Sequence, residues 1–170
     1  MLGFFKPRYK ELLIGRLERQ YLHDVAEIQK ASFASPWEDG AIAEMLNGRG
    51  VAGLVAQTVK NKTHLVAAFI IYRTVAKESE VISIACAPKL RRSGAARALM
   101  QEFIGICLAD RLSEIFLEVD DANKPALALY RSLGFEKVGE RKGYYGNDSK
   151  NSDKDRPGGN ALIMRLDLKV

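Results

Sequence analysis

The chain has 170 residues, of which 47% are hydrophobic and 28% charged, and its formal net charge is +5. This length suits one domain, and this apolar fraction is enough to bury a core. No apolar run approaches the length of a membrane span, so a membrane partner is not expected. Basic and acidic residues are interleaved, and aromatic residues do not alternate with basic ones, which argues against direct nucleic-acid binding.

The first thirteen residues differ from the rest of the chain. Phe4 and Phe5 are followed at once by Lys6, Arg8 and Lys10, so the segment lacks the apolar core of a signal peptide. We expect residues 1–13 to form a mobile tail, with a short amphipathic docking segment as the alternative, and residues 14–170 to form one domain.

The cysteines and histidines of the chain limit the kinds of site that it can form. Cys86 and Cys107 lie in apolar surroundings without C-x-x-C spacing, which favours two reduced thiols in a cytoplasmic protein. His23 and His64 are far apart and neither has a ligand-spaced partner, so no metal site is expected.

The first half of the chain predicts a strand, two helices and three strands. Apolar residues recur at helical spacing after Asp24 and again after Trp37, and Gly48 to Gly50 ends the second helix. Short turns then join three apolar runs, which predicts an antiparallel meander. The runs are Val51–Val59, Leu65–Val75 and Val81–Cys86, and the turns are Lys60–Thr63 and Ala76–Ser79.

The second half predicts helix, strand, helix, strand, strand. Leu99, Phe103 and Ile106 form one stripe of a helix, and the next strand, Ile115–Val119, must run parallel to its predecessor because a whole helix joins them. A helix from Asn123 to Leu133 is expected to be buried through Ala126, Leu129 and Leu133, with Gly134 as its C-terminal cap. Strands Phe135–Arg141 and Ala161–Leu168 flank a polar loop from Gly146 to Asn160. The fold class is α/β.

The turn from Arg91 to Ala96 lies between a β-branched strand and a helix. The first N–H groups of a helix lack intrahelical acceptors and carry partial positive charge, so a phosphate suits this position. Gly94 leaves the backbone open, Ala95 and Ala96 allow close approach, and Arg91, Arg92 and Arg97 add charge. A solvated basic turn is the simpler alternative.

Further motifs follow in a fixed order. Leu117-Glu118-Val119 precedes Asn123, and Ala128-Leu129-Tyr130 precedes Leu133-Gly134-Phe135. Together with the Arg-Arg-x-Gly-x-Ala turn, this order resembles the GNAT acyl-CoA N-acyltransferases, from about Gly15 to Leu166. Ser35-Pro36-Trp37 and Tyr144-Tyr145 are similar to the RimI group of that family, which acetylates protein N-termini and is best known for a small-subunit ribosomal protein.

The resemblance implies a GNAT fold and an acetyl-CoA-dependent N-acetyltransferase. The fold has a mixed, mostly antiparallel sheet of about seven strands, with a central parallel pair that splays apart, and four flanking helices. The turn residues Arg91, Arg92, Ser93, Gly94, Ala95, Ala96 and Arg97 would bind the pyrophosphate of coenzyme A. The backbone of Ile84, Ala85 and Cys86 would pair with pantetheine and supply an oxyanion N–H.

Two candidate catalytic residues follow. Glu118 alternates with Leu117 and Val119, so it points to the opposite face of its strand, where a carboxylate can take a proton from an amine. A solvated strand-end glutamate is the alternative. Tyr130 lies seven residues after Asn123, two helical turns on, which predicts that both lie on one side of the helix about 10 Å apart. The resemblance makes Asn123 a partner of pantetheine and Tyr130 a donor to the departing sulfur.

The acceptor is expected to be a protein N-terminus, in keeping with the RimI group, because at neutral pH the neutral fraction of an α-amine is roughly 300-fold larger than that of a lysine. Trp37, Tyr144 and Tyr145 would flank the peptide channel, although Trp37 also suits a core position. The loop with Lys150, Lys154 and Arg156 is longer and more basic than the corresponding turn in the family. Two alternatives compete with this expectation. One is a GNAT enzyme for another amine, such as a polyamine, an antibiotic or an aminoacyl-tRNA. The other is a non-enzymatic protein that binds acyl-CoA or nucleic acid.

Overall fold

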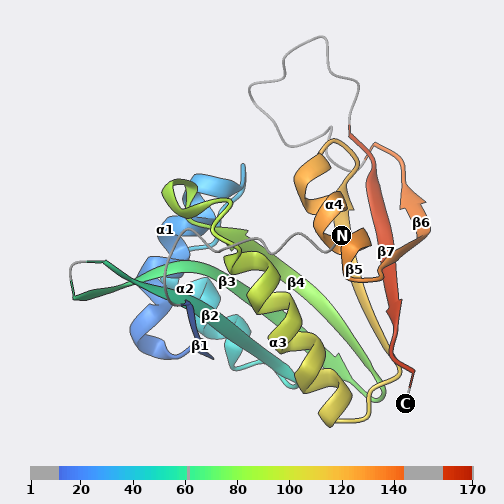
Figure 1. Cartoon of the computed structure of the whole chain (residues 1–170), viewed down its shortest axis with the longest axis horizontal. Helices are drawn as coiled ribbons and strands as arrows, with labels where there is room; N and C mark the ends of the chain where they lie inside the picture. Colours follow the sequence, from blue (N-terminus) through green and yellow to red (C-terminus); the bar gives the residue numbers. More distant parts are fainter. Residues whose placement is uncertain (1–11, 61, 144–158, 170) are drawn as a thin grey trace, which may run out of the picture. The chain divides into compact units, whose positions relative to one another are not determined.

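The computed structural model describes residues 12–60, 62–143 and 159–169. In these ranges the elements follow the predicted order of strands and helices (Figure 1). The strands are β1 (Leu12–Arg16), β2 (Val51–Lys60), β3 (Thr63–Val75), β4 (Glu78–Cys86), β5 (Glu114–Asp120), β6 (Glu136–Arg141) and β7 (Ala161–Asp167). The helices are α1 (Leu22–Ser32), α2 (Asp39–Leu46), α3 (Ala95–Ala109) and α4 (Lys124–Ser132), with short 3-10 helices at Arg19–Tyr21 and Pro88–Leu90.

The strands form one mixed sheet in the order β1-β2-β3-β4-β5-β7-β6. Strands β1 and β2 are antiparallel, as are β5 with β7 and β7 with β6. Strands β4 and β5 are parallel, with register from Glu78 opposite Glu114 to Val81 opposite Leu117. The predicted α/β class with a mixed, mostly antiparallel seven-stranded sheet is therefore confirmed.

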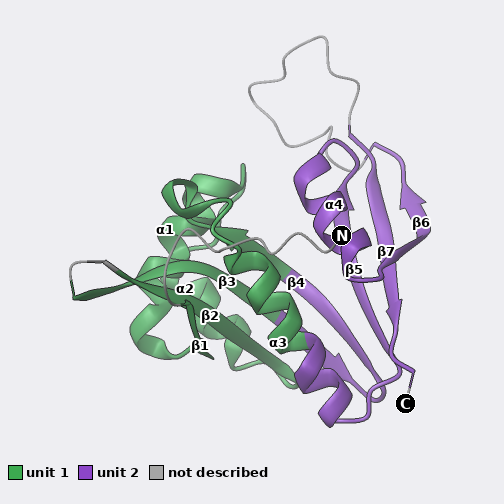
Figure 2. Ribbon diagram, viewed as in Figure 1, with its two compact units in different colours: residues 1–71, 83–103 green, residues 72–82, 104–170 purple. Residues whose placement is uncertain are grey.

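The chain divides into two compact units (Figure 2). The first comprises Met1–Ile71 and Ser83–Phe103, and the second comprises Tyr72–Ile82 and Ile104–Val170. Strand β1 begins at Leu12 and its residues Leu12 and Leu13 pair with β2, although the sequence assigns them to the tail. The single domain over residues 14–170 stays a prediction.

The core of the first unit is built on β3. Residues Ala67 to Ile71 are fully buried in an unbroken run, which is the pattern of a strand covered on both faces. Val25 and Ile28 of α1 and Leu99 of α3 are buried as their helical spacing predicts. One polar pair is buried with them: the Gln29 side-chain amide donates to the Ser83 hydroxyl at 2.9 Å, which ties α1 to β4.

The second unit shows the predicted alternation along β5. Ile115, Leu117 and Val119 are buried, whereas the residues between them are half-buried. Glu118 therefore lies on the face opposite to Leu117, as expected.

Helix α4 corrects one expectation. Its buried residues are Leu127 and Tyr130, and the predicted stripe of Ala126, Leu129 and Leu133 is only half-buried. The two stripes differ by one residue, about 100° around the helix. The physical reason is the larger area of the Tyr130 ring, which packs against Phe135 with ring centroids 6.0 Å apart.

The end of α4 explains this packing. The Gly134 N–H bonds the Arg131 carbonyl and the Phe135 N–H bonds the Tyr130 carbonyl, both at 3.0 Å, with Gly134 at φ +94°. This is a Schellman cap, in which the residue after the glycine packs on the residue that accepts its bond. The predicted Gly134 cap is present, and it brings the ring of Phe135 against Tyr130.

Candidate active site

In the first unit, the expected anion-binding turn connects β4 to α3. Arg92 and Gly94 both adopt positive φ, at 60° and 88°. The Ser93 side chain is buried, and its hydroxyl accepts from the Ala95 N–H at 3.3 Å. This hydroxyl satisfies the first N–H group of α3.

The surface of this turn is open and basic. Arg91, Arg92 and Arg97 are exposed. No atom lies within 4 Å of the position that a side-chain carbon would take at Gly94. An anion can therefore approach the backbone at the start of α3, where the helix carries partial positive charge.

The end of β4 meets this turn at Cys86. The Ala96 N–H bonds the Cys86 sulfur, and Arg91 acts on it electrostatically. Burial nevertheless raises the pKa of the Cys86 thiol, because the opposing effects of Ala96 and Arg91 are smaller. The thiol is neutral at physiological pH. The structure thus brings Cys86, Arg91 and Ala96 together, while the neighbouring Ile84 and Ala85 are half-buried.

Trp37 lies beside a separate pocket of the first unit. This pocket has a volume of about 410 Å³ and is lined by Trp37, Pro36 and residues of α1 and α2. The imidazole of His23 lies 3.6 Å from the carboxylate of Asp39 at its wall. Trp37 is half-buried and is not a fully enclosed core residue. Tyr144 and Tyr145 lie outside the described residues, as does the stretch with Lys150, Lys154 and Arg156.

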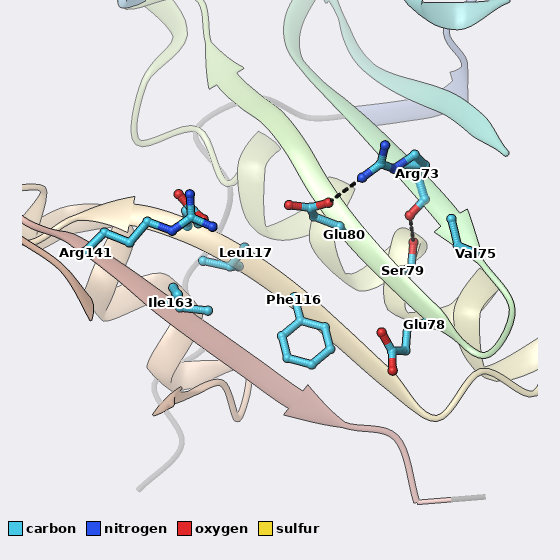
Figure 3. Close-up of a pocket in the computed structure, with 10 residues that line it drawn as sticks. Arg73, Val75, Glu78, Ser79, Glu80, Phe116, Leu117, Arg141 and Ile163 are labelled. Atoms are coloured by element: carbon cyan, nitrogen blue, oxygen red, sulfur yellow. Dashed lines mark hydrogen bonds and ion pairs between the residues drawn. The ribbon is translucent and has the colours of Figure 1, made fainter. Parts of the chain in front are cut away.

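In the second unit, Glu118 lines a pocket of about 360 Å³. Arg141, Leu117 and Ile163 lie toward one end of this pocket, and Glu78, Ser79 and Val75 toward the other (Figure 3). The side chain of Glu118 is 25% exposed, and its Oε1 lies 3.0 Å from an Nη of Arg141. A carboxylate at the wall of an open pocket is accessible to an amine, which is the first requirement for a base.

Asn123 and Tyr130 differ in their surroundings. Asn123 is the N-cap of α4, with ψ 72°, and its Oδ1 accepts from the Ala126 N–H at 3.2 Å. Because Asn123 precedes the helix, helical spacing does not set the direction of its side chain. The seven-residue spacing therefore does not place Asn123 and Tyr130 on one side of α4. Asn123 is exposed, whereas Tyr130 is 5% exposed.

Sequence reasoning missed Arg141 as a site residue. Arg141 is at the end of β6, and the sequence predicts a strand there without assigning a role to this residue. Its approach to Glu118 depends on the pairing of β6 with β7 and of β7 with β5. No local pattern in the sequence carries that register.

Comparisons with known proteins agree with these features. Residues 22–135 match the acetyltransferase (GNAT) family. The [ribosomal protein bS18]-alanine N-acetyltransferase of Escherichia coli strain K12 is 31% identical over 157 residues, which are 92% of this chain and 98% of the relative. The enzyme of the same name from Haemophilus ducreyi is 29% identical, over 92% of this chain and 100% of that one.

Solved structures give the same result. The crystal structure of the E. coli ribosomal-protein-S18-alanine N-acetyltransferase matches with a TM-score of 0.79 and 28% identity, over 94% of this chain and 96% of that one. Arabidopsis thaliana NAA60 in complex with a bisubstrate analogue matches with a TM-score of 0.77 at 15% identity, which bears on the fold alone. With its predicted motifs in the predicted order, this chain belongs to the GNAT family of acetyltransferases, among the relatives of the bS18-alanine N-acetyltransferases, and is an N-acetyltransferase.

Proposed function

We propose that this enzyme transfers the acetyl group of acetyl-CoA to the α-amine of a protein N-terminus, with a ribosomal protein as the acceptor. The observation that carries the proposal is the carboxylate of Glu118 in the wall of an open pocket. In addition, relatives that match 92% of the chain are named for acetylating the alanine of ribosomal protein bS18.

The turn before α3 fits the phosphates of acetyl-CoA. Its support is the open backbone at Gly94 and the exposed Arg91 and Arg92 beside the N-terminus of α3. Backbone groups of Ile84, Ala85 and Cys86 would bind pantetheine. Asn123 would use its side-chain amide N–H groups, since its Oδ1 already caps α4. No resident metal takes part in the proposal.

The reaction is a direct attack of the amine on the thioester. The amine nitrogen gives a proton to the carboxylate of Glu118 and forms a bond to the acetyl carbonyl carbon, and the carbon–sulfur bond then breaks to release the coenzyme A thiolate. A reference thiol titrates near 8.5 and a reference tyrosine near 10, so full proton transfer from a tyrosine to a thiolate is uphill by roughly 2 kcal/mol. We assign Tyr130 a hydrogen bond to the thiolate.

Acetylation of a matched set of synthetic acceptors tests the proposed function. The set contains a peptide with the N-terminus of bS18, the same peptide with a blocked α-amine and one internal lysine, and a polyamine. The first should react faster than the second by at least the roughly 300-fold ratio of their neutral amine fractions at pH 7. Equal turnover of the lysine peptide or the polyamine would transfer the assignment to another amine. Mass spectrometry of cellular N-termini with and without the enzyme would then identify the natural acceptor.

A prediction for Trp37 tests the acceptor channel. Trp37→Ala should raise the KM for the peptide by about 5-fold to 150-fold, the range for loss of one buried aromatic contact, and leave the KM for acetyl-CoA nearly unchanged. Steady-state kinetics with each substrate varied in turn gives both constants. Tyr145→Ala should act in the same way.

The matched control for this prediction is Phe33→Ala, which removes an aromatic ring that is 40% exposed from the same connection between α1 and α2. It should leave both constants unchanged. A peptide KM that is indifferent to Trp37→Ala would remove Trp37 from the channel.

Among the described residues, no helix is both long and apolar enough to cross a membrane. Cys86 and Cys107 are both free thiols. We propose a cytoplasmic location on the basis of these thiols and of the ribosomal acceptor named for the relatives.

A further inference from the structure

The contact between Arg141 and Glu118 spans three strands of the second unit. Arg141 pairs with Ala161 of β7, and Ile163, two residues further along β7, pairs with Glu118 of β5. Residues directly opposite one another point to the same face of a sheet, so both side chains lie on one face. Adjacent strands are about 4.8 Å apart, so the side chain of Arg141 must cross the whole width of β7.

Small residues on β6 and β7 leave room for the side chain of Arg141 to cross β7. Ala161 presents only a methyl group next to Arg141. Gly139, the neighbour of Ile163 on β6, has no side chain, and a side-chain carbon there would lie 3.2 Å from Ile163. The guanidinium can therefore extend over β7 to the carboxylate of Glu118, at the end of the pocket where Figure 3 labels Arg141 and Ile163.

The other charged groups of this face have partners of their own. Arg73 lies 3.2 Å from Glu80, and Arg165 lies 3.4 Å from Glu114 and 3.1 Å from Asp167. On the opposite face of β6, Lys137 pairs with Glu140 at 2.6 Å.

Two further carboxylates border the same face. Asp120, next to Glu118 on this face of β5, accepts from the Ala122 N–H at 2.8 Å. Glu78, on β4, lines the far end of the pocket. Within the residues that the structure describes, the cation in contact with Glu118 is thus Arg141.

The ion pair does little for the stability of the fold. The side chain of Arg141 is 56% exposed, and exposed ion pairs contribute little to folding because solvent screens them. Its effect is local: a guanidinium at 3.0 Å restricts the rotamers of the Glu118 side chain.

We propose that Arg141 is a positioning residue for Glu118, which holds the carboxylate at the pocket wall so that it can accept the proton of the amine. This inference rests on the proposed function, because it needs Glu118 as the base. It adds a second residue to the proton-transfer step, acting through Glu118.

Steady-state kinetics of Arg141→Gln and of wild type with one N-terminal peptide test this inference. A carboxylate that is no longer held at the pocket wall is less often in place to accept the proton of the amine. The kcat for the peptide should therefore fall by about 5-fold, as expected for the loss of one partly exposed ion pair, while the KM for acetyl-CoA should stay unchanged.

Three variants separate this role from a structural one. Arg141→Lys keeps the charge and should recover part of the lost rate. Lys137→Gln removes the cation of another exposed ion pair on β6 and should match wild type. In the Glu118→Gln background, Arg141→Gln should have no further effect, since a residue that acts through Glu118 has nothing left to position.

The outcomes are distinguishable from a failure of the proposed function. A wild-type enzyme that does not acetylate N-terminal peptides, or a fully active Glu118→Gln, refutes the function or the base. With both of those established, an unchanged kcat in Arg141→Gln, a lysine variant no better than glutamine, or additive losses in the double variant would each overturn the role of Arg141.

Discussion

Glu118→Gln is expected to lower kcat/KM for a peptide acceptor by about 10²-fold to 10⁴-fold, the range for a lost general base. The amide keeps the shape of the side chain but cannot take a proton. The loss should be largest at low pH, where most of the amine is protonated, and part of it should return as the pH rises and solvent deprotonates the amine. Rate measurements from acid to alkaline pH on one peptide check this result.

Tyr130→Phe is the matched comparison. The ring of Tyr130 packs on Phe135 beneath the Schellman cap, and phenylalanine keeps that ring, so the fold should be retained. Loss of the hydroxyl should lower kcat without recovery at high pH, because the step that it assists releases the thiolate. If both variants follow wild type within a factor of about two, neither residue has the proposed role.

Gly94→Glu should abolish acetyl-CoA binding, measured by calorimetry. The carboxylate would occupy the open space at the N-terminus of α3 and repel the phosphates, and since such like-charge contacts cost several kcal/mol the affinity should fall more than about 100-fold. Thermal melting should show a folded protein, because the new Cβ would meet no residue other than its chain neighbours within 4 Å.

Gly94→Ala is the control for backbone strain. Gly94 has φ +88°, so both alanine and glutamate carry a strain of about 1–3 kcal/mol, but only glutamate adds charge and bulk. The alanine variant should retain measurable binding. Unchanged affinity in Gly94→Glu would remove the phosphate assignment from this turn.

Features with a local cause could be predicted from the sequence. The order of the elements follows from apolar periodicity, and the parallel pairing of β4 with β5 follows from the helix between them. The outward face of Glu118 follows from simple alternation along β5. The cap at Gly134 and the open backbone at Gly94 follow from the conformational freedom of glycine.

Features that depend on competing local interactions were predicted less well. The buried stripe of α4 lies one residue away from the predicted one, because the packing of Tyr130 on Phe135 outweighs the burial of Ala126. Asn123 and Ser93 were assigned to the ligand from the motif, and the structure shows that a side-chain oxygen of each accepts a bond from the backbone at the start of a helix. The same residue type suits both tasks, so a motif does not separate them.

The sequence by itself determined the family of this enzyme, the order of its strands and helices, and the two residues proposed for catalysis. Only the tertiary structure decided which charge stands beside Glu118. The side chain of Arg141 reaches it across β7, and that approach depends on the registers of two strand pairs. Register is set by contacts between segments that are distant in the chain, so a local pattern of residues does not contain it.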